Sequence, residues 1–140
     1  LILLDRGIDA KAEVIKRLTD NLEIEQRARC GAEVEAAIWQ REAIFSTALG
    51  FAIALPHCKS PAVTSSSVSV MRLASPLAWN EEVSVSLIIM LTVSEEEKGD
   101  HMKIFSRLAR KLMHADFRQQ LLEGNNPQAV AELLQREIAM

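Results

Sequence analysis

Histidines are the residues of this 140-residue chain whose chemistry calls for explanation, and the three of them stand in different surroundings. His57 follows a proline at the end of an apolar run, and His101 stands where a long helical stretch begins. His114 lies near a helix end, where an imidazole can interact with free backbone carbonyls. A neutral imidazole is a competent nucleophile near neutral pH, so His57 and His101 are the candidates for covalent chemistry.

A phosphoryl group is one electrophile that such a histidine can accept. Its transfer needs in-line positioning and donors that hold the equatorial oxygens. Arg41 can bind two oxygens at once, while Ser46 and Thr47 can donate from their hydroxyl groups. Free amides at the helix start near His101 would attract the same anion. A structural role for Arg41, either paired with Glu42 or capping a helix, explains that residue equally well.

A zinc site is the competing chemistry, with His57, Cys58, His101 and His114 as its ligands. His57 and Cys58 are adjacent, however, and adjacent side chains of an extended chain point apart, which disfavours a shared ion. The motifs GxxxxGKS/T, GxSxG and HExxH are missing from the sequence, so the usual nucleotide-binding, serine-hydrolase and zincin interpretations do not apply.

Two amphipathic helices are predicted before these residues, because apolar side chains recur at three- and four-residue steps. The first is expected to be capped by Asp9 and to start at Ala10, with inward side chains at Val14, Ile15, Leu18 and Leu22. The second is expected to open at Gly31, with Val34, Ile38 and Ala37 facing inward and Arg41 at the end of that stripe.

Strands are predicted at residues 52–55, 67–73 and 83–93, while the apolar run 1–4 is compatible with a strand or the end of one and is too short for periodicity to decide. The strand at 83–93 becomes continuously apolar at 87–91, as in a central strand buried on both faces. Pro56 lacks an N–H for the sheet, so His57 is expected just past a strand end. The pairs Ser75-Pro76 and Trp79-Asn80 are expected in the connection between the two later strands.

Three helices are predicted after residue 97. The first is long, starts near His101 and carries the apolar residues Ile104, Phe105, Leu108 and Leu112. A short helix is expected between Asp116 and Gly124. The last helix is expected to be capped by Asn126 and to start with Pro127. This order of elements predicts a single α/β domain over residues 1–140, with a mixed β-sheet flanked by helices on both faces.

The composition is that of an ordinary globular protein. With a net charge of -3, the chain shows no electrostatic signature of nucleic-acid binding. Its apolar runs are far shorter than the roughly 20 residues of a membrane span. The two cysteines, Cys30 and Cys58, are too few for a disulfide framework, and a cytoplasmic location is expected. The chain does not begin with methionine, so it is expected to be a trimmed chain or one module of a longer polypeptide.

The series Arg41-Glu42, Ser46-Thr47, Gly50 and Ala54-Leu55-Pro56-His57, with a second histidine at position 101, resembles the signature of the fructose and mannitol type of enzyme IIA in the bacterial sugar phosphotransferase system. The resemblance continues through the apolar strand 83–93, the segment 101–109 and the helix that begins at Asp116. It therefore covers nearly the whole chain.

The resemblance implies a phosphocarrier. His57 would take a phosphoryl group on Nε2 from the phosphohistidine of the carrier protein HPr and pass it to a cysteine of a cognate enzyme IIB. His101 would orient or neutralise the phosphoryl oxygens, Arg41 would bind the same anion, and Thr47 is a candidate hydroxyl donor. No metal or other cofactor would be needed, and the membrane would be reached only indirectly, through enzyme IIC.

The same resemblance allows a second function, that of a phosphorylation sensor that controls a transcription regulator or another protein partner. The sequence also departs from the family pattern before the histidine. Ala48, Phe51 and Ala52 replace glycine or small polar residues, which predicts a stiffer and more apolar loop, and Cys58 is an unusual neighbour for His57.

Overall fold

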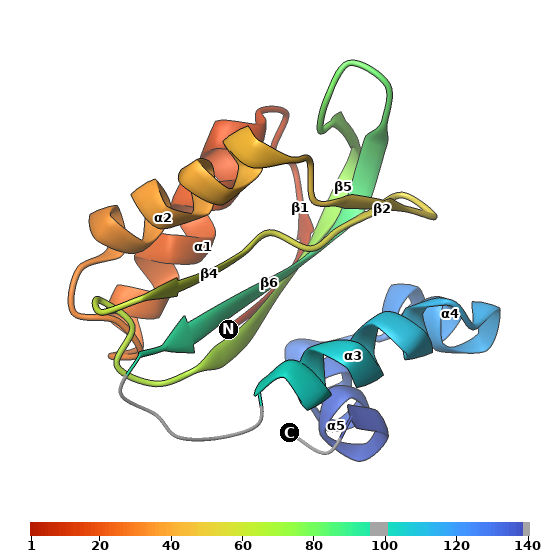
Figure 1. The fold of residues 1–140 in the computed structure, drawn as a ribbon. Coiled ribbons are helices and arrows are strands. Elements are labelled where there is room, and N and C mark those ends of the chain that lie inside the picture. The colour runs from red at the N-terminus through yellow and green to blue at the C-terminus, as the bar shows by residue number, and fades with distance from the viewer. Residues whose placement is uncertain (96–100, 139–140) are drawn as a thin grey trace. The chain divides into compact units, whose positions relative to one another are not determined.

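The computed structural model describes residues 1–95 and 101–138, which fall into two compact units (Figure 1). The first unit holds a β-sheet with the helices α1 (Lys11–Ile24) and α2 (Gly31–Ile44). The second holds the helices α3 (His101–Leu112), α4 (Ala115–Glu123) and α5 (Pro127–Ile138).

The sheet is mixed and six-stranded, and it contains the residues around His57. Its strands are β1 (Ile2–Arg6), β2 (Ala48–Gly50), β3 (Ile53–Ala54), β4 (His57–Ser60), β5 (Ser67–Ala78) and β6 (Ser84–Ser94). The main order is β1-β5-β6-β3-β2, and β4 pairs with β6 outside this path. The pairing of β5 with β6 is antiparallel, whereas β3 and β4 both run parallel to β6. The predicted mixed α/β class is confirmed.

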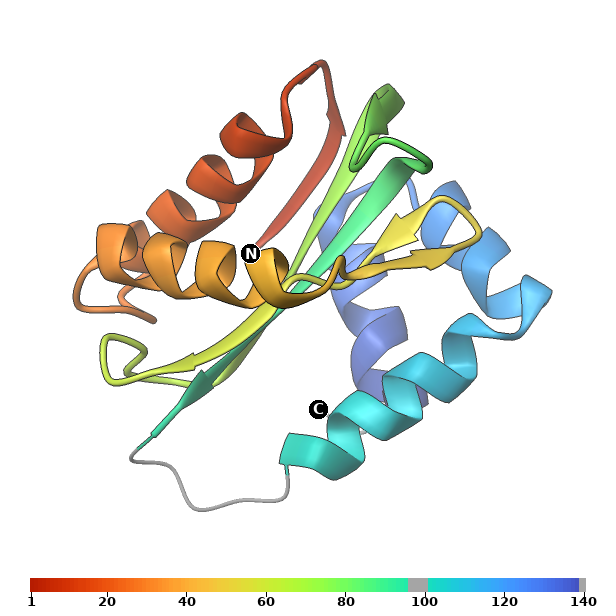
Figure 2. The ribbon, with the colours of Figure 1, turned by 45° about the horizontal axis from the view of Figure 1, so that its top comes forward.

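The helices α1 and α2 lie side by side on one face of the sheet (Figures 1 and 2). The predicted inward residues of α1 are buried, as are Val34 and Ile38 of α2, while Ala37 packs partly buried against the same core. Sheet residues Met71, Ile88 and Met90 close this core from below the helices. Amphipathic periodicity therefore identified the buried face of both helices correctly.

The predicted start of α1 is wrong. The capping position is Ala10, and Asp9 lies outside the helix, which begins at Lys11. Ala10 is extended at φ -134°, and its carbonyl accepts the amides of Glu13 and Val14, both at 3.1 Å. The backbone thus closes the first turn without a capping side chain, and the carboxylate of Glu13 supplies the favourable charge at this end of the helix.

The predicted end of β5 is also wrong, because the strand continues through Pro76 to Ala78. The register between β5 and β6 shifts between the pairs Arg72–Leu87 and Leu77–Val85. An irregularity of this kind leaves residues unpaired on one strand, which is where a residue without an N–H can be tolerated. Trp79 and Asn80 lie in the turn that follows, as predicted.

A tight hairpin joins β2 to β3, with Phe51 and Ala52 at its centre. Gly50, Phe51 and Ala52 have φ values of 108°, 55° and 59°. Positive φ at both central residues is what a two-residue hairpin turn of type I′ needs, and glycine or asparagine usually supplies it. The carbonyl of Ala52 accepts the amides of Ser86 at 2.9 Å and Leu87 at 3.2 Å, so pairing with β6 holds the strained turn in place.

Replacing Ala52 with glycine is expected to raise the free energy of unfolding by about 1 kcal/mol, because glycine adopts positive φ without a steric penalty. The matched control is Ala109→Gly on the exposed side of α3, which should lower the same quantity by about 1 kcal/mol. Urea unfolding curves of both variants measure the difference. A loss of stability in Ala52→Gly as large as that in Ala109→Gly would contradict the strained-turn interpretation.

The helices of the second unit pack on one another. As predicted, α4 ends before Gly124, and Asn126 caps α5 through a 2.8 Å bond from the amide of Ala129 to its Oδ1. Lys111 of α3 and Glu137 of α5 form an ion pair at 2.9 Å. Among the helices that the structure describes, none has the length and hydrophobicity needed to cross a membrane.

Candidate functional site

His57 is the first residue of β4 and is partly buried. Its Nδ1 lies 2.9 Å from the carbonyl oxygen of Leu55. A carbonyl can only accept, so in the neutral ring Nδ1 carries the proton and donates it in this bond. The other nitrogen, Nε2, is then left with the lone pair. The backbone therefore selects the ring nitrogen that can act as a nucleophile.

The expectation that His57 lies just past a strand end needs correction. The chain does leave β3 after Ala54, but it rejoins β6 at once as β4. Pro56 interrupts the pairing because it has no N–H, yet its carbonyl still accepts the amide of Leu91 at 3.0 Å. This bond keeps the chain alongside β6, and His57 pairs with Leu91 in the parallel register. The imidazole therefore stands at the start of β4, directly after the interruption between two short strands.

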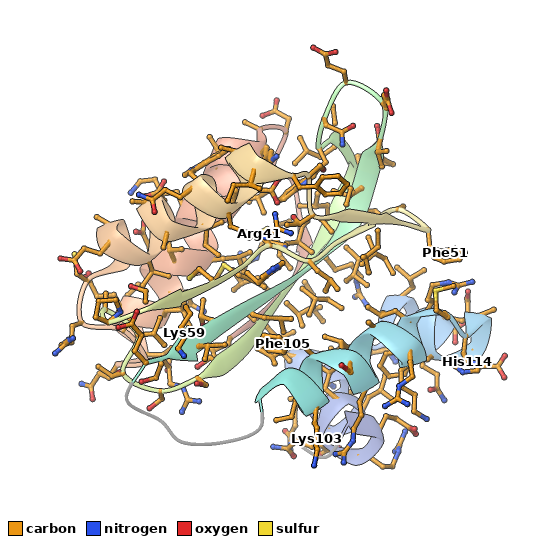
Figure 3. The ribbon with its side chains drawn as sticks, in the orientation of Figure 1. Arg41, Phe51, Lys59, Lys103, Phe105 and His114 are labelled. Carbon is orange, nitrogen blue, oxygen red and sulfur yellow. The ribbon has the colours of Figure 1, made fainter. Side chains whose placement is uncertain are left out.

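Arg41 lies in the last turn of α2, a helix that packs against β4, and its side chain is partly buried. Figure 3 shows the side chain extending from the helix toward β4. Its Nη1 donates to the carbonyl of Phe45 at 2.7 Å, which satisfies an orphan carbonyl at the helix end. Arg41 thus has the capping role considered above, and this bond uses one of several donors on the guanidinium.

Thr47 is buried, and its hydroxyl donates to Oε1 of Glu42. The second carboxylate oxygen of Glu42, Oε2, forms an ion pair with Nζ of Lys11 at 2.9 Å. Glu42 is therefore paired with Lys11 and Thr47. The alternative considered from the sequence, an Arg41–Glu42 pair, is not among these contacts. A backbone bond then joins Thr47 to the residues just before His57, because the amide of Leu55 donates to the Thr47 carbonyl at 2.9 Å.

The roles of Lys11 and Glu42 were missed by sequence reasoning, although a signal for Glu42 was present. Glu42 continues the inward stripe of Val34 and Ile38 at a four-residue step, so its carboxylate had to be buried. A buried carboxylate needs partners, and their presence could have been expected. Nothing in the local pattern pointed to Lys11, because its contact with Glu42 spans 31 residues of sequence.

Ser46 accepts two hydrogen bonds on its hydroxyl oxygen. Nδ2 of Asn80, in the turn between β5 and β6, donates at 3.0 Å, and the amide of Ala48 donates at 3.3 Å. Since both contacts use the oxygen as acceptor, the Ser46 proton can be offered to a further group. Ser46 therefore ties the start of β2 to the next turn of the sheet.

Cys58 follows His57 and has its side chain in the core beneath α1 and α2. Burial raises the pKa of its thiol to about 11. The thiol therefore stays protonated at neutral pH and is a poor nucleophile or metal ligand. Among the described side chains, from which His101 is left out, no group of three or more histidine, cysteine or acidic residues could hold a metal ion.

The two remaining histidines belong to the second unit. His101 is the first residue of α3, as predicted, but its side chain lies outside the described part of the structure. Its role beside His57 therefore stays a prediction. His114 is exposed and occupies the N-cap position of α4 without a side-chain capping bond (Figure 3).

Large apolar side chains are exposed on the stretch between Arg41 and His57. The exposed fractions are 80% for Ile44, 73% for Phe45, 50% for Leu49 and 56% for Phe51. Phe51 lies at the tip of the β2–β3 hairpin (Figure 3). The four side chains come from the end of α2, from β2 and from the turn that follows it.

The mixed sheet holds an imidazole whose Nδ1 is bound to the backbone, so that Nε2 is the ring nitrogen able to act as a nucleophile. Over residues 1–137 the chain matches the family model described as phosphoenolpyruvate-dependent sugar phosphotransferase system, EIIA 2. The chain therefore belongs to this EIIA family, which confirms the resemblance found in the sequence.

Among its relatives, the chain is 45% identical over 140 residues to Multiphosphoryl transfer protein 2 of Escherichia coli (strain K12), an alignment that covers 99% of the chain and 17% of that protein. The chain thus spans about a sixth of the length of this relative. The PTS system fructose-specific EIIA component of Haloferax volcanii is 35% identical over 100 residues, covering 70% of this chain and 65% of the relative.

Solved structures share the fold. Nitrogen Regulatory Protein IIA-Ntr from Neisseria meningitidis has a TM-score of 0.85 and 27% identity, covering 95% of this chain and 92% of that chain. Mannitol enzyme IIA of Escherichia coli, solved in a complex with phosphorylated mannitol enzyme IIB, has a TM-score of 0.77 and 21% identity, covering 96% of this chain and 94% of its own. At 21% identity, the likeness to the mannitol enzyme shows a shared fold alone.

Proposed function

We propose that residues 1–140 form a phosphocarrier domain that accepts a phosphoryl group from phospho-HPr on Nε2 of His57 and passes it to a cysteine of a cognate enzyme IIB for sugar uptake. The observation that carries this proposal is the 2.9 Å contact between Nδ1 of His57 and the Leu55 carbonyl. It leaves Nε2 as the nucleophilic nitrogen on a partly buried ring.

The transfer is balanced without a cofactor. The Nε2 lone pair of His57 forms a bond to phosphorus as the N–P bond of phospho-HPr breaks, and the HPr imidazole leaves with the electron pair. In the second step the cysteine of enzyme IIB, as a thiolate that has released its proton to solvent, forms the S–P bond as the N–P bond to His57 breaks, and His57 recovers its lone pair. The N–P bond supplies the driving force, so the reaction requires neither nucleotide nor metal.

Further side chains would support the phosphoryl group. Arg41 extends toward β4 and has guanidinium donors beyond the one used by Phe45, which suits it to bind phosphoryl oxygens. We assign His101 to the same anion. The hydroxyl of Thr47 donates to Glu42, so we propose that Thr47 supports the site through this bond and does not donate directly to the phosphoryl group.

The partners proposed are protein domains. The exposed side chains at Ile44, Phe45, Leu49 and Phe51 offer an apolar surface for HPr and enzyme IIB to bind in turn. The membrane would be involved only through enzyme IIC, and nucleic acid is not a proposed partner. The chain would act in the cytoplasm, where phospho-HPr is made.

A labelling experiment tests the proposal. Radiolabelled phosphoenolpyruvate, enzyme I and HPr are expected to place one acid-labile phosphate on each chain, and a panel of enzyme IIB domains is then added. Loss of label from the chain together with its gain by one enzyme IIB supports the phosphocarrier. A chain that stays unlabelled while a known enzyme IIA in the same mixture is labelled refutes it.

A phosphorylation sensor is the second candidate, and the similarity to the nitrogen regulatory IIA protein favours it. In this case His57 would be phosphorylated in the same way, but the phosphate would change the binding of a regulatory partner. The labelled chain would then keep its phosphate in the presence of every enzyme IIB domain. A regulator that binds the labelled and unlabelled chains with different affinity would support this function.

A further inference from the structure

A partly buried ion pair lies near the site, and the transfer reaction described above makes no use of it. The side chains of Lys11 and Glu42 are 20% and 3% exposed, and Nζ lies 2.9 Å from Oε2. Glu42 uses its other oxygen to accept the Thr47 hydroxyl, so each carboxylate oxygen has a partner. A carboxylate so deeply buried would be costly without both contacts, which makes this geometry well defined.

Two tryptophan rings fix the lysine. Nζ of Lys11 lies 4.6 Å from the centre of the Trp79 ring and 5.5 Å from that of Trp39. Both distances are within the range of cation–π contacts, and Trp79 is buried. The ammonium group is thus held by one carboxylate and two aromatic faces. Lys11 is therefore a partly buried and well-contacted residue, unlike the exposed Lys16 five residues further along α1.

An unbroken series of bonds leads from this ion pair to the imidazole. Glu42 holds the side chain of Thr47, and the Thr47 carbonyl accepts the amide of Leu55 at 2.9 Å. The carbonyl of Leu55 in turn accepts Nδ1–H of His57 at 2.9 Å. The residue that sets the His57 tautomer is therefore itself positioned by Thr47.

We propose that Lys11, Glu42 and Thr47 are positioning residues for His57. By holding the backbone of Thr47, they keep the Leu55 carbonyl aimed at Nδ1 and so keep Nε2 unprotonated for attack on phosphorus. The inference rests on the proposed function of His57, although its effect on the tautomer can be measured without any phosphotransfer.

The direction of the Thr47 hydrogen bond distinguishes a positioning role for Thr47 from direct donation to the phosphoryl group. A carboxylate only accepts, so the single hydroxyl proton of Thr47 points to Glu42 and is not available to a phosphoryl oxygen. Direct donation by Thr47 predicts that Lys11 is irrelevant to transfer. A positioning network predicts instead that removing the Lys11 charge disturbs His57.

The test compares Lys11→Met and Thr47→Val with the wild-type chain, using nitrogen chemical shifts of the His57 ring at a pH where it is neutral. We expect the wild type to hold its proton on Nδ1 and both variants to show a larger share of the Nε2–H tautomer. Single-turnover phosphorylation by phospho-HPr should become about tenfold slower at saturation, with the half-saturating HPr concentration unchanged.

Matched controls separate positioning from general destabilisation. Lys16→Met removes an exposed lysine from the same helix, where it pairs with Asp20 at 3.2 Å, and should leave tautomer and rate unchanged. Thr47→Ser keeps the hydroxyl and should therefore show the wild-type His57 tautomer and the wild-type rate. Glu42→Gln keeps the side-chain shape and provides a further variant if Lys11→Met does not fold.

The outcomes are distinct. Wild-type tautomer and rate in both Lys11→Met and Thr47→Val would overturn the inference, and so would a slower rate with an unchanged tautomer. If the tautomer shifts as expected but even the wild-type chain takes up no phosphate, the positioning network stands and the proposed function fails.

Discussion

A chain in which His57 is replaced by glutamine is expected to take up no phosphate from phospho-HPr, with the rate falling by at least about 10³-fold. The glutamine amide nitrogen has no basic lone pair, so it cannot attack phosphorus. Glutamine is close to histidine in size and polarity, and the strand pairing of residue 57 uses the backbone, so the fold should persist. Acid-labile label and the far-ultraviolet circular dichroism spectrum measure these two properties.

The matched control is His114→Gln. His114 is exposed at the start of α4 and makes no side-chain capping bond there, so this variant should be labelled like the wild type. Takeover of the reaction by Cys58 is not expected, because burial raises the pKa of its thiol to about 11 and keeps it protonated. Persistent labelling of His57→Gln would show that another residue is the phosphate acceptor.

A large loss of stability is expected when Ile88 is replaced by alanine, with the free energy of unfolding falling by roughly 2–5 kcal/mol. Ile88 has no exposed surface, and it pairs with Met71 of β5 and with Ala54 of β3. Its truncation would leave a cavity at the centre of the sheet, beneath α1 and α2. Urea unfolding followed by circular dichroism measures the change.

The control uses the same substitution at an exposed site. Ile44 is 80% exposed at the end of α2, so Ile44→Ala should change the free energy of unfolding by no more than about 0.5 kcal/mol. Because both variants lose the same atoms, the difference between them reports burial. Equal effects at the two positions would mean that the core does not include Ile88 as described.

Elements with a strong local signal were predictable from the sequence. Burial is indicated by the apolar stripes of α1 and α2 and by the continuous apolar run of β6. These patterns can be recognised from neighbouring residues alone. The strand β4 has no such signal, because its four residues His57–Ser60 are mostly polar and are extended through pairing with β6. Strand structure of this origin depends on tertiary contacts that the local sequence does not contain.

The candidate site was predictable from the sequence to about the same extent as the fold. His57 was identified as the candidate nucleophile and Arg41 was placed at the end of the α2 stripe, both from residue type and position. The tautomer of His57 depends on the carbonyl of Leu55, and the geometry of Thr47 depends on Glu42 and Lys11. These contacts join α1, α2 and the sheet, so their partners became evident only in three dimensions.

The bond from Nδ1 of His57 to the Leu55 carbonyl has a consequence for recognition. The phosphoryl group would be added to the opposite ring nitrogen, so loading and unloading the carrier need not break any backbone hydrogen bond of the sheet. The two states would then share one backbone and differ by about two negative charges. A partner that must release the empty carrier and retain the loaded one would have to distinguish them by charge, because their shapes would be nearly the same.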